Sequence, residues 1–325
     1  MNAPLDLAGR TVLLHSPQSG VAERIHALIE AGATLTVACA EPDAVLDDIA
    51  SRGLIDVVAE ADPLAFDVVV RDRTRSEPLA RRPELGSVTL VGGGPGDIGL
   101  LTVAGMQAIR EADVIVCDRL APLGALVDAR PDTEVIHVGK IPRGEFTPQE
   151  RINEIIVQKA LAGLNVVRFK GGDSFVFGRG GEEWIACAEA GVAVRSIPGV
   201  SSSIAAAELA GIPVTHRSVT QGFIVVSGHV APNDPRNAVD WAALARSGLT
   251  IVVLMGVAAL DEIATTLIAA GLPSSTPAAC IADASLPTQR SATAALADIA
   301  QIAAAEGISA PAVTVIGDVV DALPR

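Results

Sequence analysis

The chain has 325 residues, enough for about two domains at roughly 150 residues each. Half of the residues are apolar and 19% are charged, which is typical of a folded globular protein and excludes a disordered one. The net charge of −14 and the eight aromatic residues argue against a nucleic-acid surface built from basic and stacking side chains. The longest apolar run, residues 250–260, is too short to span a bilayer.

The cysteines and histidines show no metal-ligand spacing. Four cysteines are widely scattered without a Cys-x-x-Cys pair, which fits a reducing compartment, and the five histidines are equally dispersed. We therefore predict no metal site. The first ten residues carry Asp6 and lack a basic start followed by an apolar core, so we expect no secretory signal and a cytoplasmic location.

Residues 1–85 predict a small Rossmann-like βαβ segment followed by a linker. Strands are expected at 11–14, 34–39 and 66–70, helices at 21–31 and 44–52, and the linker at 71–86. The turn after the first strand contains His15, Ser16, Pro17, Gln18 and Ser19 where a dinucleotide site needs glycines, and only Gly20 follows. The segment is therefore interpreted as a degenerate dinucleotide fold, and NAD is not expected to bind.

A second α/β stretch is expected at 86–212 and a third at 213–325. The second contains predicted strands at 87–91, 114–117, 134–137, 166–169 and 194–197, and predicted helices at 101–112, 148–162, 181–190 and 201–210. The third contains predicted strands at 222–227, 250–255, 278–282 and 312–315, and predicted helices at 241–245, 261–270 and 292–305. Such alternation predicts mostly parallel sheets with ligands at the carboxyl ends of their strands, so we expect a cleft where the two stretches meet.

Glycine-rich turns carry most of the functional signal. The sequence GGDSFVFGRGGEE at 171–183 follows an apolar strand, and its glycines are expected to let backbone approach a ligand closely. No Gly-Lys-Ser/Thr follows, which excludes a phosphate loop. The segment GGGPGDIG at 92–99 formally matches a dinucleotide fingerprint, but Pro95 removes an amide donor and Asp97 places a negative charge where a pyrophosphate would lie. A phosphate-free or cationic ligand fits better.

Charged residues at strand ends are the candidates for acid-base chemistry and for anion binding. Residues 137–181 contain seven Lys or Arg and four acids in an otherwise acidic chain. Lys140, Lys170 and Arg179 adjoin glycines and are the best candidates for contacting an anionic substrate. Asp118 and Lys140 follow neighbouring strands and could act as acid and base, although a turn salt bridge at Asp118–Arg119 explains the first as well.

In order along the chain, GGGPGD, CDRL, VGK, VVRFKGGDSFVFGRGGEE, IPGVSSSIAAAELAGIPVTHR, VSGH and LMG resemble the uroporphyrinogen-III C-methyltransferases of the tetrapyrrole methylase superfamily. The resemblance covers about residues 87–318. It implies a two-lobed α/β fold, a homodimer, S-adenosyl-methionine as methyl donor, and methylation of uroporphyrinogen III through precorrin-1 to precorrin-2, in siroheme and cobalamin biosynthesis.

The resemblance also implies roles for individual residues. Asp118 would be the proton acceptor and Lys140 the proton donor, with Arg179 and Glu182 also catalytic and His216 and Arg217 holding the tetrapyrrole. The implied donor site comprises Pro95, Gly171, Gly172, Asp173, Val176, Ser201, Ser202, Met255 and Ala284. Four positions depart from the family pattern: Cys117, Ser174, Leu254 and Ala284 replace the usual Tyr, Pro, Tyr and Gly.

Three alternatives stay open at this point. The first segment is similar to the N-terminal domain of siroheme synthases, so the chain could be bifunctional, with NAD-dependent precorrin-2 dehydrogenase activity. It could methylate a later corrin intermediate, although the GRGGEE and THR blocks favour the uroporphyrinogen-III C-methyltransferases. It could also bind tetrapyrroles without catalysis, although Asp118, Lys140 and Arg179 are all present.

Overall fold

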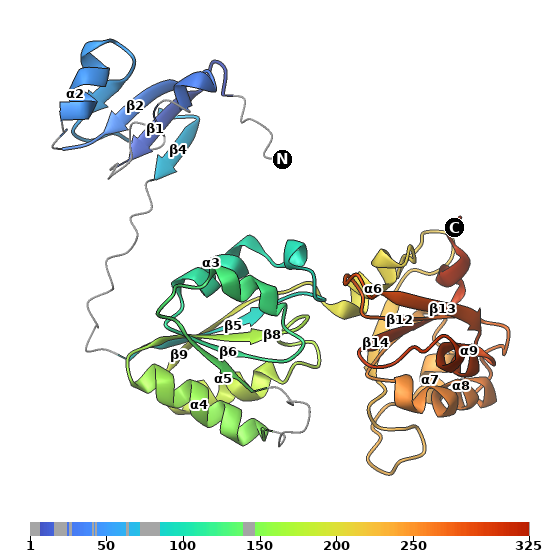
Figure 1. Ribbon diagram of the computed structural model, residues 1–325. Coiled ribbons are helices and arrows are strands. Elements are labelled where there is room, and N and C mark those ends of the chain that lie inside the picture. Colours follow the sequence, from blue (N-terminus) through green and yellow to red (C-terminus); the bar gives the residue numbers. More distant parts are fainter. Residues whose placement is uncertain are drawn as a thin grey trace. The chain divides into compact units, whose positions relative to one another are not determined.

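The computed structural model describes residues 7–15, 25, 28–40, 42, 44–62, 65–71, 85–138 and 147–324 (Figure 1). The chain forms two compact units, residues 1–82 and 83–325. Each unit has its own apolar core.

The smaller unit contains a four-stranded parallel sheet in the order β3-β2-β1-β4. The strands are β1 (Thr11–His15), β2 (Thr34–Ala38), β3 (Asp56–Val58) and β4 (Val68–Arg71), and the helix α2 spans Ala44–Ser51. Alternate strand residues such as Val12, Leu14 and Val37 are fully buried against Ile25 and Leu46. The strand β3 was not predicted, because three residues are too few to show a period. The turn at 16–24 and the linker at 72–84 lie outside the described residues.

The first sheet of the larger unit is entirely parallel, as predicted, in the order β7-β6-β8-β5-β9. Its strands are β5 (Ser87–Gly92), β6 (Val114–Cys117), β7 (Glu134–His137), β8 (Asn165–Lys170) and β9 (Ala193–Ile197). Helices α4 (Gln149–Leu161) and α5 (Gly180–Glu189) cover one face and α3 (Val103–Glu111) the other (Figure 1). Because both faces are covered, the central strands are mostly apolar on both sides, with Arg168 and Lys170 of β8 as buried charged exceptions.

The second sheet of the larger unit is mixed, which corrects the prediction of mostly parallel strands. Its order is β10-β11-β14-β12-β13, and of its four neighbouring pairs only β10–β11 is parallel. The strands are β10 (Phe223–Ser227), β11 (Thr250–Leu254), β12 (Pro277–Ala282), β13 (Arg290–Ala295) and β14 (Ala312–Ile316). Helices α7 (Trp241–Ala245), α8 (Leu260–Ala269) and α9 (Ile299–Ala305) cover one face, and α6 (Ser202–Leu209) covers the other.

One predicted helix is wrong in its first half. Residues 292–305 were expected to be helical because they are rich in alanine, but β13 occupies Arg290–Ala295 and α9 begins at Ile299. Six residues of β13 pair antiparallel with β12, and Ala292 is buried beneath α9. Tertiary pairing therefore overrides the helix propensity of alanine here.

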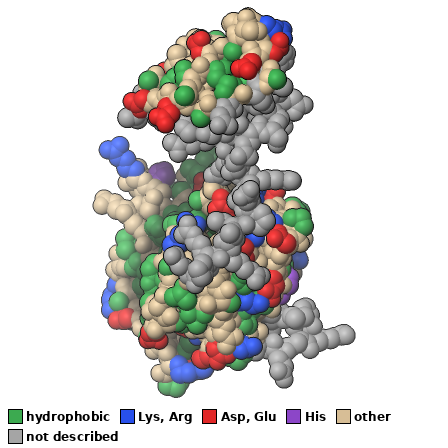
Figure 2. Space-filling model, turned by 90° about the vertical axis from the view of Figure 1, so that its left-hand side faces the viewer, with side chains coloured by type: hydrophobic (Ala, Val, Ile, Leu, Met, Phe, Trp, Pro, Cys, Tyr) green, Lys and Arg blue, Asp and Glu red, His purple; other side chains and the backbone are tan. Residues whose placement is uncertain are grey.

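Short 3-10 helices occupy several loops of the larger unit: η2 (Ile98–Leu100), η3 (Leu123–Asp128), η4 (Val257–Ala259) and η5 (Asp318–Asp321). Within the described residues, no helix has the length and apolar character needed to cross a membrane. The same residues contain no group of three or more His, Cys, Asp or Glu side chains placed to hold a metal ion. On the face of the larger unit shown in Figure 2, acidic and basic side chains are interspersed, with no single basic area.

Candidate active site

Three loops meet at the carboxyl ends of β5, β8 and β9. The amide of Gly94 donates to the carbonyl of Gly172 at 3.1 Å, and the amide of Gly172 donates back to Gly94 at 2.7 Å. Gly199, which follows β9, lies so close that an added Cβ would stand 2.3 Å from the carbonyl oxygen of Gly172. Glycine is required at this junction because the backbones themselves are in contact.

Three glycines of 171–183 are required by the fold itself, and their contact with a ligand stays a prediction. Added Cβ atoms at Gly171, Gly178 and Gly180 would stand 2.5–2.6 Å from the backbone oxygens of Leu120 or Ser174. Gly172 differs: its φ is +64°, and the nearest atoms to an added Cβ are those of Ser202 at 3.8 Å. Of the five glycines, only Gly172 and Gly181 leave open space beside the backbone.

Asp173 links the loop after β8 to the loop after β9. Its Oδ1 accepts from the amide of Phe175 at 2.8 Å, and its Oδ2 accepts from the amide of Gly199 at 3.1 Å. Both carboxylate oxygens are therefore occupied by backbone donors. Ser201, in the same loop region, caps α6 by accepting from the amide of Ser203 at 3.3 Å.

The loop after β5 reaches the second sheet through Asp97. The amide of Asp97 donates to Oγ of Ser285 at 2.9 Å, and its Oδ1 accepts from the amide of Gly99 at 2.7 Å, capping η2. The acid thus occupies the helix N-terminus, as expected for a loop that does not bind a pyrophosphate. Pro95 lies in the same loop, and Ala284 is buried next to Ser285 after β12.

The loops at the carboxyl ends of β11 and β12 are strained. Met255, Asp283 and Ser285 have φ values of 57°, 50° and 74°, a left-handed region that residues other than glycine seldom adopt. Such strain concentrates at ligand sites, where the fold holds an unfavourable backbone in place. Met255 is 48% exposed, so its side chain is accessible at this edge.

A buried ion cluster adjoins these loops and consists of Asp118, Arg168, Lys170 and Glu183. Arg168 donates through Nη2 to Oδ1 of Asp118 at 2.5 Å and through Nε to Oε1 of Glu183 at 2.8 Å. Lys170 donates to the same Glu183 oxygen at 3.0 Å, and its Nζ lies 3.8 Å from Oδ2 of Asp118. Arg168, Lys170 and Glu183 are at most 3% exposed, whereas the side chain of Asp118 is 31% exposed.

This cluster corrects the expectation that Lys170 meets an anionic substrate. Burial lowers the pKa of Lys170 and the neighbouring Arg168 lowers it further, while Glu183 and Asp118 oppose this. Its ammonium group is enclosed in the protein and bound to Glu183. The sequence analysis did not predict Arg168 as a site residue. Its position between two apolar residues of the strand Asn165–Lys170 could have indicated a buried charge. The described ion pairs of Asp118 are with Arg168 and Lys170 rather than with Arg119.

Arg179 and Glu182 form an ion pair at the start of α5. Arg179 adopts φ 58° as the residue before the helix and donates to both Glu182 oxygens, at 3.0 and 2.6 Å, with both side chains about half exposed. The hydrogen bond to Glu182 raises the pKa of Arg179. The pair is accessible for an anionic substrate.

The other predicted residues are spread along the same loops. His216 is half-buried, and its Nδ1 accepts from the amide of Ser218 at 3.3 Å, while Arg217 beside it is exposed. Val176 is 36% exposed in the loop before α5. Lys140 lies outside the described residues. Among the residues that the structure describes, no hydrogen bond or ion pair joins His216 or Arg217 to the Asp118 cluster, so their part in a common site stays a prediction.

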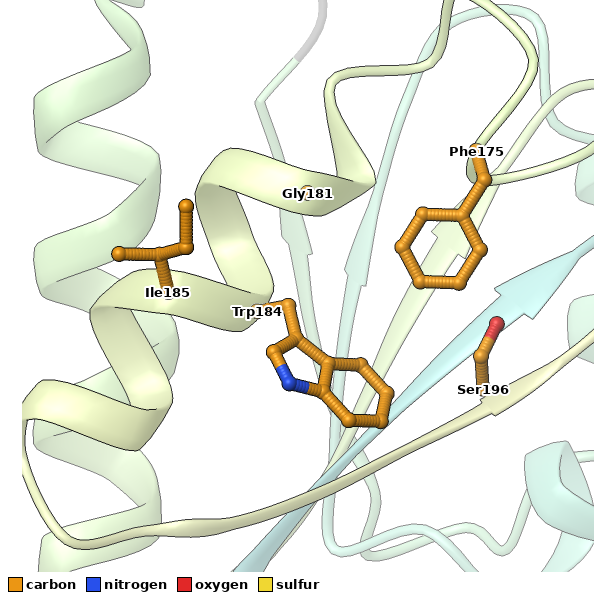
Figure 3. Close-up of a pocket in the computed structure, with 5 residues that line it drawn as sticks. All are labelled: Phe175, Gly181, Trp184, Ile185 and Ser196. Carbon is orange, nitrogen blue, oxygen red and sulfur yellow. The ribbon is translucent and has the colours of Figure 1, made fainter.

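An open apolar cavity of about 540 Å³ lies beside α5 (Figure 3). It is lined by Phe175, Gly181, Trp184, Ile185 and Ser196. The rings of Phe175 and Trp184 are tilted against each other with centroids 6.1 Å apart. The cavity belongs to the first sheet alone, and the predicted cleft between the two stretches stays a prediction.

Residues 87–300 match the family model of Tetrapyrrole (Corrin/Porphyrin) Methylases. The chain belongs to this family. It is 46% identical to a siroheme synthase of Neisseria meningitidis serogroup B over 72% of this chain and 48% of that protein. It is also 46% identical to the uroporphyrinogen-III C-methyltransferase of Bacillus subtilis, over 73% of this chain and 49% of that protein. The chain thus spans about half the length of these curated relatives.

A solved structure supports the same family assignment. The uroporphyrin-III C-methyl transferase from Thermus thermophilus, complexed with S-adenyl homocysteine, superposes with a TM-score of 0.62 at 38% identity. The match covers 73% of this chain and all of the Thermus chain. The predicted family and two-lobed fold are confirmed.

Proposed function

We propose that the protein transfers methyl groups from S-adenosyl-methionine to uroporphyrinogen III, giving precorrin-2 through precorrin-1. One observation carries the proposal. The paired backbone of Gly94 and Gly172, which has no side chains, lies at the same sheet edge as Asp118. Asp118 is a partly exposed carboxylate that is bound by buried cations. Close backbone approach and an adjacent proton acceptor are what this reaction needs. The names of the relatives and of the Thermus structure support the substrate and the donor.

The donor site would be formed by the loops after five strands. Pro95, Gly171, Gly172, Asp173 and Val176 come from the first sheet, Ser201 and Ser202 from the start of α6, and Met255 and Ala284 from the second sheet. The open space beside Gly172, which a Cβ would fill, fits a ligand there, and Asp97 disfavours a phosphate-bearing one. The donor supplies an electrophilic methyl group when bound.

The chain's own residues would orient the acceptor and move its protons. Asp118 would accept the proton that the macrocycle loses after methyl transfer, from a position other than the newly quaternary pyrrole carbon, and Lys140 would donate one. Arg179, His216 and Arg217 would hold carboxylates of the macrocycle by charge-assisted hydrogen bonds, with Glu182 fixing Arg179 in place. The contribution of the fold is mainly alignment of two reactants.

The direct test incubates the protein with uroporphyrinogen III and methyl-labelled donor. We expect label in the tetrapyrrole and a product with two added methyl groups. The variant Asp118→Asn, which keeps the shape of the side chain and removes its charge, should lower the rate constant at least 100-fold. Absence of label with the unaltered protein would refute the proposal, and a panel of later corrin intermediates would show whether one of them is the substrate instead.

We also propose that the protein is a cytoplasmic homodimer. The exposed apolar side chains of Phe175, Trp184 and Ile185, which are 54%, 37% and 57% exposed, support self-association, because apolar patches often mark interfaces. Light scattering should give twice the mass of one chain. Ile185→Glu should reduce it to one chain, whereas Leu161→Glu, at an exposed leucine of α4, should not. A single-chain mass for the unaltered protein would contradict the dimer.

A further inference from the structure

We infer that Arg168 is the positioning residue of the reaction: it fixes the carboxylate of Asp118 from inside the sheet. The inference rests on the proposed function, in which Asp118 accepts the proton. Arg168 itself is 1% exposed and touches no substrate, so its effect would pass through Asp118.

The guanidinium group of Arg168 is held on every side by fixed partners. Nη1 donates to the backbone carbonyls of Val116 at 3.1 Å and Phe169 at 3.3 Å, and Nε donates to Glu183. Val116 and Phe169 belong to the neighbouring strands β6 and β8, so the group spans two strands of a rigid sheet. The remaining nitrogen, Nη2, can therefore present its proton to Asp118 in only one direction.

The charges of the cluster explain why so buried a cation is tolerated. Two cations, Arg168 and Lys170, face two acids, Asp118 and Glu183, so the cluster is neutral when all four are ionised. Burying a charge is costly unless it is paired and hydrogen-bonded, and Glu183 supplies a counter-charge that has no access to solvent. Glu183 is thus the internal partner of Arg168, and Asp118 is the partner that reaches the surface.

Asp118 follows the last residue of β6 and is anchored by two hydrogen bonds, with the Lys170 ammonium group 3.8 Å from its Oδ2. Its amide donates to the carbonyl of Phe169 at 3.0 Å, and its Oδ1 receives the Arg168 proton at 2.5 Å. Loss of the second anchor would let the side chain sample other rotamers about χ1. A proton acceptor that must meet one carbon of a bound macrocycle loses efficiency when its position is not fixed.

The test is a double-mutant cycle between Arg168→Gln and Asp118→Asn in the full-length protein. We expect Arg168→Gln to lower kcat 10- to 100-fold while the Kd of S-adenosyl-homocysteine changes less than 2-fold. In the Asp118→Asn background the same substitution should produce no further fall. The control is Arg130→Gln, which breaks the Arg130–Asp113 ion pair of 2.6 Å at the opposite end of β6 and should leave kcat unchanged.

Two further measurements keep the inference falsifiable. If Arg168→Gln does not fold, the double variant Arg168→Gln/Glu183→Gln removes one buried charge of each sign and should fold, with the same loss of kcat. The χ1 rotamer populations of Asp118, measured by NMR scalar couplings, should spread in the variant, whether or not uroporphyrinogen III is the substrate. Equal losses of kcat in both backgrounds, or an unchanged rotamer distribution, would overturn the inference. Lack of methyl transfer by the unaltered protein would refute the proposed function alone.

Discussion

At the scale of single residues, the site is built by side chains that hold backbone in place. Asp173 is the clearest case, because its two oxygens accept from amides of two different loops. The sequence predicts that Asp173 belongs to the donor site. It does not predict that Asp173 links two loops, because the second donor, Gly199, lies 26 residues further along the chain.

Asp173→Asn should weaken binding of the donor product. An asparagine side chain offers one acceptor oxygen instead of two, so one of the two loop contacts would be lost, at a cost of about 1–2 kcal/mol. Calorimetric titration with S-adenosyl-homocysteine should show a Kd raised roughly 10-fold. The matched control is Asp234→Asn, which alters an exposed turn in the second half of the chain. An unchanged Kd for Asp173→Asn would contradict a link between this carboxylate and the donor site.

The buried thiols predict how stability depends on pH. Burial raises the pKa of Cys117 and of Cys187 to about 11 from the ordinary thiol value of 9.0. A raised pKa favours the protonated form in the folded state, so the stabilisation is complete below pH 9 and is lost as the pH rises from about 9 to about 11. The loss should be about 1.4 kcal/mol per pH unit and thiol. Thermal midpoints measured across this range should fall less steeply for Cys187→Ala, and equal slopes would count against the assignment.

At the scale of elements, the sequence predicted strands and helices well wherever the period was long enough to read. The parallel sheet β7-β6-β8-β5-β9 was predicted strand by strand, because its central strands are largely apolar on both faces. Apart from the three-residue strand β3, which was missed, the errors fell on β13 and on strand direction in the second sheet. Pairing with β12 decides the structure of residues 290–295, and neither pairing partner nor direction is encoded in a local pattern.

Because three loops are in backbone contact at Gly199, a single added methyl group at this position should strongly destabilise the protein. Gly199→Ala would place a Cβ 2.3 Å from the carbonyl oxygen of Gly172 and 2.5 Å from the carbonyl carbon of Gly92, both backbone atoms that cannot move independently. We expect a loss of about 1–3 kcal/mol or more, and a thermal midpoint lower by roughly 5–10 °C.

Gly181→Ala is the matched control for this experiment. No atom lies within 4 Å of the added Cβ, and the residue is in the first turn of α5, where alanine is the better helix former. Its thermal midpoint should stay the same or rise slightly. Equal destabilisation by the two substitutions would show that the close approach of the three loops is not what makes Gly199 necessary.

At the scale of the whole molecule, the two compact units differ in what can be inferred of them. The larger unit, residues 83–325, contains both sheets of the tetrapyrrole methylase and matches the Thermus chain over its full length. The smaller unit shows the parallel order β3-β2-β1-β4 of a dinucleotide-binding fold, while its ligand turn at residues 16–24 lies outside the described residues. The sequence predicts that this turn lacks the glycines for NAD.

Removal of residues 1–82 should therefore leave methyl transfer intact. The larger unit has its own cores on both faces of each sheet, and the residues proposed for the donor and the acceptor all belong to it. The kcat of the shortened chain should stay within about 2-fold of the full-length value. The shortened chain should also unfold in a cooperative thermal transition of its own.

NAD binding is tested on the same two preparations. Neither the full-length nor the shortened chain should bind NAD in a fluorescence titration. A shortened chain that folds but no longer methylates would show that the smaller unit contributes to the site, and NAD binding lost with residues 1–82 would restore the bifunctional alternative.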